Sequence, residues 1–139
     1  FQKNPQVTFL LHGMETVRVE DVGMEDRIMP FLENYDNVYY SLDAAPIPFF
    51  YGPSSAQEFL ARFTEEFPDL LDAAIKKWKS RIEAQPDKFL WGTDRLETWH
   101  FDVEVGGLLE EFARSFIGSL DKEAQERFAY KNAERLLEE

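Results

Sequence analysis

Short apolar runs alternate with longer amphipathic segments along this chain. Three runs have the length and the β-branched or aromatic content of strands, and they cover residues 7–11, 37–44 and 89–92. The first, VTFLL, lies between Pro5 and Gly13 and is continuously apolar, so we expect it to be buried on both faces. The pattern thus predicts three short strands.

The segments between the strands have helical spacing. Residues 24–35 predict a modest helix, which Pro30 should keep short or delay. Ser55 and Glu58 have capping-box spacing, so a second helix should begin there. That helix carries a stripe of core-packing aromatic residues, should pause at Pro68 and then resume as the second member of a helix pair. The stripe and its continuation comprise Phe59, Phe63, Phe67, Leu71, Ile75, Trp78 and Ile82.

After the third strand, the chain is predicted to be helical to its end. One helix should end at Gly118, and a further helical stretch should follow. The expected packing positions of these helices are Leu108, Leu109, Phe112, Phe116, Ile117, Phe128, Leu136 and Leu137.

The order of strands and helices predicts an α/β fold with a parallel sheet and right-handed crossovers. In such sheets, ligands bind beyond the carboxyl ends of the strands. His12, Asp43 and Asp94 each lie at or just after a predicted strand end. We therefore expect the three side chains to share one edge of the sheet.

His12 and Asp94 are the candidates for chemistry at that edge. A neutral imidazole can bind a metal or take a proton, and a carboxylate can act as a hard oxygen ligand or a general base. Structural roles compete with this interpretation, because a histidine after a strand is often a turn residue and an aspartate after Gly-Thr can be a helix N-cap.

Composition limits the function classes. The 139 residues suit one ordinary domain, 1–139, and 27 acidic against 15 basic residues give a net charge of -12. This charge disfavours nucleic acid and anionic membranes as partners, so we expect a small-molecule substrate or a cation. The absence of cysteine excludes disulfides and thiolate chemistry.

No secretion signal or membrane span is recognisable, which favours a soluble, cytoplasmic protein. The start at Phe1 suggests a chain cut from a longer polypeptide.

Four motifs give the chain a resemblance to a known family. TFLLHG, NVYYSLDA, QPDKFLWGTDR and YKNAERLL resemble, in this order, the closing third to half of the amidohydrolase-related metal-dependent hydrolases. That family belongs to the amidohydrolase superfamily of (β/α)₈, or TIM, barrels. The resemblance implies that the three strands are barrel strands six to eight.

The resemblance also implies a mechanism. His12 would match a histidine that binds a second metal or assists catalysis, and Asp94 a metal-binding aspartate that takes a proton from the attacking water. The implied cofactor is a divalent cation, with zinc as the expected ion. The implied reaction is hydrolysis of an amide, ester or related bond, because a cation lowers the pKa of water and a nearby carboxylate can accept its proton.

The chain departs from the family in two respects. The family's strand-one His-x-His, strand-four lysine or carboxylate and strand-five histidine are not in these residues, and a whole barrel needs about 250 residues. Metal binding and activity by this piece alone should therefore be weak. After Asp94 the chain reads RLETWHFD rather than the family's aromatic-proline step, so Arg95, Trp99 and His100 could contact substrate or be ordinary loop residues.

Other expectations concern loops and assembly. Asp43 is a further substrate-binding candidate, and the PIPFF loop with Tyr51 could stack a planar substrate, form a hydrophobic plug or contact another subunit. Half a barrel would leave strand edges unpaired, which predicts a homo-oligomer or a rearranged sheet. Two alternatives to the hydrolase are a metal-dependent decarboxylase of an aromatic or unsaturated acid in the same superfamily, and a non-catalytic α/β interaction module.

Overall fold

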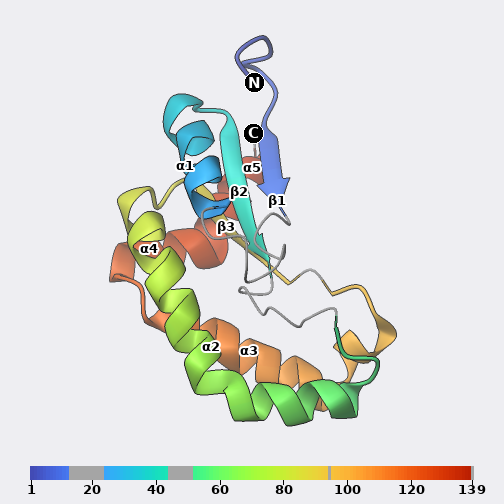
Figure 1. Ribbon diagram of the computed structural model, residues 1–139. Helices are drawn as coiled ribbons and strands as arrows, with labels where there is room; N and C mark the ends of the chain where they lie inside the picture. The colour runs from blue at the N-terminus through green and yellow to red at the C-terminus, as the bar shows by residue number, and fades with distance from the viewer. Residues whose placement is uncertain (13–23, 44–51, 94, 139) are drawn as a thin grey trace.

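A computed structural model describes residues 1–12, 24–43, 52–93 and 95–138. Figure 1 shows the strands with helices on both sides of them, and α2 and α3 running side by side below the strands. The elements, in chain order, are β1 (Phe9–His12), α1 (Met24–Asn34), β2 (Val38–Asp43), α2 (Ala56–Ala84), β3 (Phe89–Gly92), the 3₁₀-helix η1 (Thr98–Phe101), α3 (Val103–Gly118), α4 (Lys122–Glu126), the π-helix η2 (Arg127–Lys131) and α5 (Asn132–Glu138).

The three strands form a parallel sheet in the order β1-β2-β3. In the register, Leu11 pairs with Tyr40 and Tyr40 pairs with Phe89. The predicted α/β class, parallel pairing and third strand are confirmed, and the other two strands are shifted or trimmed by one or two residues at their ends. The QPDK turn before β3 is short, because only residues 85–88 lie between the end of α2 at Ala84 and the start of β3 at Phe89.

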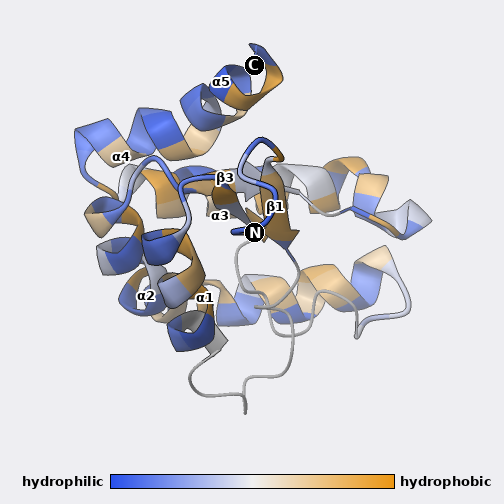
Figure 2. Ribbon diagram, turned by 90° about the horizontal axis from the view of Figure 1, so that it is seen from above, coloured by the Kyte–Doolittle hydropathy of each residue, from blue (hydrophilic) through white to orange (hydrophobic). Residues whose placement is uncertain are grey.

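Different helices cover the two faces of the sheet. Val38, Tyr40 and Leu42 alternate along β2 and join the core with α1 and α2. Tyr39, on the other face, is instead contacted by Arg135 of α5, whose guanidinium lies 5.4 Å from the ring centre. Figure 2 agrees, with α5 on one side of the strands and α1 and α2 on the other. Alternation along β2 thus divides the sheet into two differently covered faces.

One aromatic-rich core cluster joins these layers. Trp78 of α2 stacks on Tyr40 with ring centres 5.8 Å apart, and Phe63 of α2 contacts Phe112 of α3 at 5.4 Å. The prediction that Phe59, Phe63 and Phe67 pack in the core is confirmed, since the first two are fully buried and the third is partly buried against them. The fully buried large side chains are Trp78, Tyr40, Phe59, Phe63, Phe89, Phe112, Phe116, Phe128, Ile28, Leu32 and Leu42.

The burial predicted for the first strand was wrong. Val7 and Leu10 are 42% and 51% exposed, whereas Phe9 and Leu11 pack against the core. The reason is that β1 lies at the end of the strand order and pairs only with β2 within the described residues. An edge strand covered on one face buries alternate side chains, even when its sequence is apolar throughout.

The short helix predicted at residues 24–35 is confirmed as α1, which has 11 residues and contains Pro30. The predicted pause at Pro68 was wrong, because α2 runs unbroken through this residue for 29 residues. An internal proline loses one backbone hydrogen bond and costs about 3 kcal/mol. In α2 that cost is offset because the helix buries large side chains on both sides of Pro68, including Phe63 and Trp78. The expected helix pair is therefore one helix.

The helix ends follow the sequence signals. Ser55 accepts a hydrogen bond from the Glu58 backbone N–H, which confirms the predicted start of α2, and α3 ends at Gly118 as predicted. At the C-terminus, Phe128 is buried but Leu137 is 88% exposed, so Leu137 is not a packing position. No helix in the described ranges is both long enough and apolar enough to cross a membrane.

Candidate functional site

The carboxyl ends of the three strands meet at one edge of the sheet. His12, the last residue of β1, pairs with Ser41, and Asp43, the last residue of β2, pairs with Gly92, the last residue of β3. The parallel register therefore gathers the strand ends where the sequence predicted them. This edge and the turn that follows β3 form the candidate site.

His12 is exposed at this edge. It occupies the same row of the sheet as Ser41 and Leu90, on the face opposite to the α1 and α2 layer. Its neighbours in that row are buried, at 8% for Ser41 and 7% for Leu90. The imidazole is thus accessible beside a mostly buried row of side chains.

Of the predicted site residues, Asp43 is described by its backbone alone and Asp94 is not described. For Asp43 the backbone position is given by its pairing with Gly92. Asp94 lies outside the described residues, as do Tyr51 and the PIPFF loop. The convergence of His12 and Asp94 therefore stays a prediction, while the backbone two residues before Asp94 lies at the same edge as His12.

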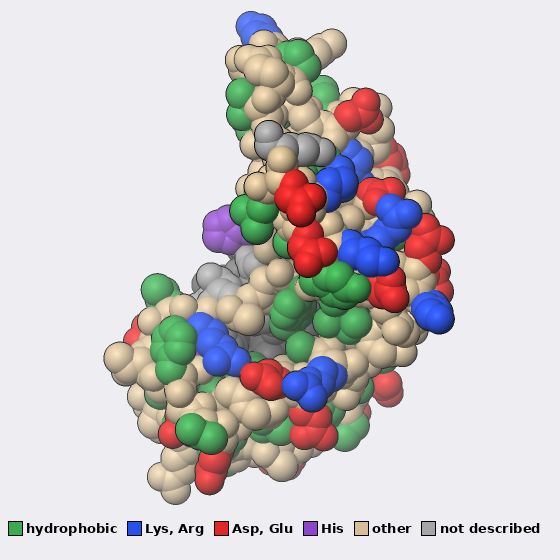
Figure 3. Space-filling model, turned by 180° about the vertical axis from the view of Figure 1, so that it is seen from behind, with side chains coloured by type: hydrophobic (Ala, Val, Ile, Leu, Met, Phe, Trp, Pro, Cys, Tyr) green, Lys and Arg blue, Asp and Glu red, His purple; other side chains and the backbone are tan. Residues whose placement is uncertain are grey.

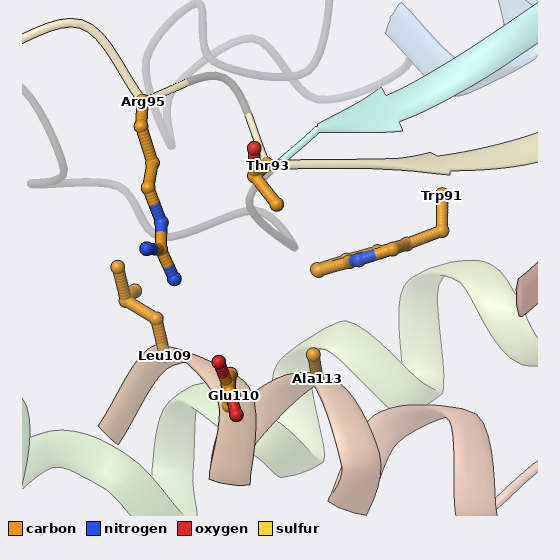
Figure 4. Close-up of a pocket in the computed structure, with 6 residues that line it drawn as sticks. All are labelled: Trp91, Thr93, Arg95, Leu109, Glu110 and Ala113. Atoms are coloured by element: carbon orange, nitrogen blue, oxygen red, sulfur yellow. The ribbon is translucent and has the colours of Figure 1, made fainter. Parts of the chain in front are cut away.

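Arg95 lies against a small cavity between the end of β3 and α3 (Figure 4). The cavity has a volume of about 50 Å³. Its described lining residues are Trp91, Thr93, Arg95, Leu109, Glu110 and Ala113. Since a buried water needs about 10–15 Å³ of such volume, the cavity can hold a group of three or four heavy atoms.

Gly106 of α3 lies beside the Arg95 guanidinium. A Cβ atom at this buried glycine would lie 3.6 Å from Nη1 and 3.8 Å from Nη2 of Arg95, which is ordinary contact distance. Arg95 Nε is buried and has no hydrogen-bond partner among the residues that the structure describes. A guanidinium presents five donors, and a buried donor without an acceptor is costly. Arg95 therefore has at least one hydrogen-bond donor, Nε, that a ligand could satisfy.

Glu110 is the acidic residue of the cavity lining. Its Oε2 atom lies 3.4 Å from Nη2 of Arg114, one turn further along α3, and both side chains are more than half exposed. The remaining walls are apolar or carry a single hydroxyl, at Thr93. The cavity thus has an arginine on one wall and a carboxylate at its rim that is already paired with another arginine.

His100, predicted to contact a substrate, is enclosed by the protein. It is fully buried, and its Nδ1 atom accepts hydrogen bonds from the backbone N–H groups of Leu96 and Glu97 at 3.0 and 3.1 Å. The Glu97 side chain accepts a bond from the His100 backbone in return, which completes a capping box at η1. His100 therefore stabilises the turn between β3 and α3 and offers no atom to the surface.

Trp99 also packs rather than projecting into the cavity. Its ring lies 5.3 Å from that of Phe59 and 4.1 Å from that of His100, measured between ring centres. The residue is partly buried against the core. Of the three residues proposed from the segment RLETWHFD, Arg95 is the one that lines the cavity.

The described residues do not by themselves form a metal site. Among them, no group of three or more His, Asp and Glu residues lies close enough to hold an ion. A stable zinc site usually has three or four protein ligands. His12 is an accessible imidazole, so a metal site at this edge would need further ligands from outside the described residues.

Charge is mixed over the rest of the surface. Figure 3 shows acidic and basic side chains next to one another over the upper part of the face it presents. Ion pairs among the described residues include Arg127 with Glu123 and Arg81 with Asp26. Such pairs do not change the net charge of the chain, and the expectation that nucleic acid is not a partner stays a prediction.

Sequence reasoning did not identify most of the cavity. Glu110, Leu109 and Ala113 come from the middle of α3, where helical spacing indicates which residues share a face but not what that face contacts. Trp91 was assigned to the strand and Thr93 to the turn, and neither was linked to a site. The available signal was Gly106, since a glycine within a helical pattern can mark a packing contact.

Comparison with protein-family models, with curated protein sequences and with solved structures finds no match to this chain.

Proposed function

We propose that this chain contributes the C-terminal part of the active site of a metal-dependent hydrolase of the amidohydrolase superfamily. In this proposal, β1, β2 and β3 are strands six to eight of a TIM-type barrel. The observation that supports it most is the register, because it brings the end of β1 at His12 to the same edge as the end of β3 at Gly92. Active sites of such barrels lie at this edge.

His12 and Asp94 have distinct roles in the proposed site. The exposed imidazole of His12 would be a ligand, and Asp94, two residues after β3, would be a ligand and would accept the proton of the attacking water. A divalent cation, for which zinc is the expected ion, would lower the pKa of that water molecule. The other ligands would come from other strands of the barrel, since the described residues hold no complete set.

A decarboxylase of an aromatic or unsaturated acid is the second candidate. Arg95 favours it, because its guanidinium beside the cavity suits a substrate that carries a carboxylate. Product analysis separates the two reactions, since a decarboxylase releases CO₂ and a hydrolase consumes water to give two products. If neither product forms, the interaction module gains support.

The test is metal content and turnover in the polypeptide translated from the complete coding sequence. We expect Asp94→Asn and His12→Gln each to lower turnover of amide and ester substrates by about 100-fold or more, with loss of bound metal. Asp69→Asn, at an exposed position of α2, is the matched control and should change neither. Unchanged metal content and turnover in Asp94→Asn would refute the proposed role of Asp94.

The coding sequence upstream of Phe1 provides an independent check. An apolar strand that ends in His-x-His within about 200 residues, the length of five further βα units, would support the hydrolase. An in-frame start codon immediately before Phe1 would favour the interaction module.

A further inference from the structure

We infer that the cavity beside Arg95 binds the carboxylate group of a small organic acid. The inference deepens the proposed function by naming a substrate class, and it rests on that function for the statement that the acid is a substrate. Binding of the acid itself can be measured without any turnover.

The position of Arg95 is the first reason. Its guanidinium lies beside α3 at Gly106, at ordinary contact distance from where a Cβ of that residue would lie. Figure 4 shows the side chain reaching from the end of β3 toward α3, with Trp91 on the opposite side of the cavity. An arginine held in this way loses less side-chain entropy when an anion binds to it.

Unused hydrogen-bonding capacity is the second reason. Among the described residues, Arg95 Nε is buried without an acceptor, and no carboxylate forms an ion pair with this guanidinium. The rigid fork of guanidinium donors matches the two oxygens of a carboxylate. A planar anion in the cavity would therefore accept bonds that the described protein groups do not provide.

The size and lining of the cavity limit which ligands can bind there. A volume of about 50 Å³ fits a carboxylate group of three heavy atoms and excludes a whole aromatic acid. Trp91, Leu109 and Ala113 present apolar surface. The acid should therefore carry its carboxylate on an apolar or aromatic carbon, with the rest of the molecule outside the cavity.

The charge at the rim does not oppose this ligand strongly. Glu110 is exposed and pairs with Arg114, whereas Arg95 is partly buried and faces the cavity. Attraction to the less solvated arginine outweighs repulsion by an exposed, paired carboxylate, because water screens the latter more.

The experiment measures binding of benzoate to the full-length protein by isothermal titration calorimetry, with benzamide as an uncharged probe of the same shape. We expect benzoate to bind at least about 10-fold more tightly than benzamide, and Arg95→Gln to remove that difference. Arg62→Gln is the matched control, because it removes a half-exposed arginine of α2 that does not line the cavity. It should leave benzoate binding unchanged.

A second variant covers the case in which Arg95→Gln fails to fold. Gly106→Val keeps the charge, but its branched side chain would displace the guanidinium, so we expect a similar loss of benzoate binding. Equal binding of benzoate and benzamide, or benzoate binding that persists in Arg95→Gln or Gly106→Val, would overturn the inference.

The outcomes separate this inference from the proposed function. Benzoate binding that depends on Arg95 in a protein without metal-dependent turnover would retain the site and reject the hydrolase. Turnover that depends on Asp94, together with benzoate binding that does not depend on Arg95, would support the hydrolase and reject the carboxylate site.

Discussion

Asn132 of α5 closes the outer edge of β3, and its replacement provides the sharpest test of the fold. Its side-chain Nδ2 donates to the carbonyl oxygens of Pro86 at 2.7 Å and Phe89 at 2.8 Å, and the residue is 2% exposed. The Lys88 carbonyl accepts from Tyr40 N–H of β2, so the next carbonyl, that of Phe89, points away from β2. Asn132 thus satisfies a carbonyl group of β3 that has no strand partner on that side within the described parts of the chain.

The expected cost follows from these two bonds. In Asn132→Ala, the buried Phe89 carbonyl loses its partner, which costs about 1–3 kcal/mol, and loss of the half-buried bond to Pro86 adds about 1 kcal/mol. We therefore expect the free energy of unfolding to fall by about 2–4 kcal/mol. Asn132→Asp should cost more near neutral pH, because it places a carboxylate against two carbonyl oxygens.

Urea unfolding followed by tryptophan fluorescence measures this change. Asn34→Ala is the matched control, since Asn34 Nδ2 also donates to a proline carbonyl, that of Pro30 at 2.6 Å, but at an exposed position. It should change stability by less than about 0.5 kcal/mol. If Asn132→Ala were as mild as Asn34→Ala, the reasoning that Asn132 closes the sheet edge would be refuted.

Three further changes probe other parts of the structure. Tyr40→Phe should be neutral or stabilising by up to about 1 kcal/mol in urea unfolding, because the Tyr40 hydroxyl is buried with no partner among the described residues, and a loss above about 1 kcal/mol would contradict this. Gly107→Ala should raise stability by about 0.5–1 kcal/mol in the same assay, since a Cβ there meets nothing within 4 Å and alanine favours the helix; a lower stability would count against the described helix. Hydrogen bonds from Ser54 lower the pKa of Glu58 below its usual 4.5, so its stabilising effect is present above pH 4.5 and is lost as pH falls through the lowered pKa. Glu58→Gln should therefore lower the melting temperature at pH 7 but not at pH 2, and an equal effect at both would refute the assignment.

The sequence predicted the parts of the fold that depend on local pattern. The strand at residues 89–92 and the start of α2 at Ser55 were found because a turn and a capping box mark them. The continuity of α2 through Pro68 was missed, because the burial that offsets the proline comes from contacts with distant segments. The exposure of Leu10 was missed for the same reason, since an apolar run does not show how many neighbours a strand has.

The candidate site was predictable only in outline. Strand ends indicated where the backbone of His12 and Asp43 would lie, because parallel strands bring their carboxyl ends together. The burial of His100 was not predictable from its spacing, since it depends on two backbone N–H groups of a 3₁₀ turn. The cavity depends on how α3 packs beside β3, which no short-range pattern encodes.

Side-chain bonds that fasten the sheet lie at the amino ends of its strands. The Lys88 ammonium donates to the carbonyl oxygens of Tyr35 and Asp36, both at 2.9 Å, and Asn37 donates to that of Val7 at 2.7 Å. Asn132 fastens the start of β3 in the same way. These described anchors lie at the edge opposite to Arg95, so an exchange of Arg95 should leave the bonds of Lys88, Asn37 and Asn132 in place.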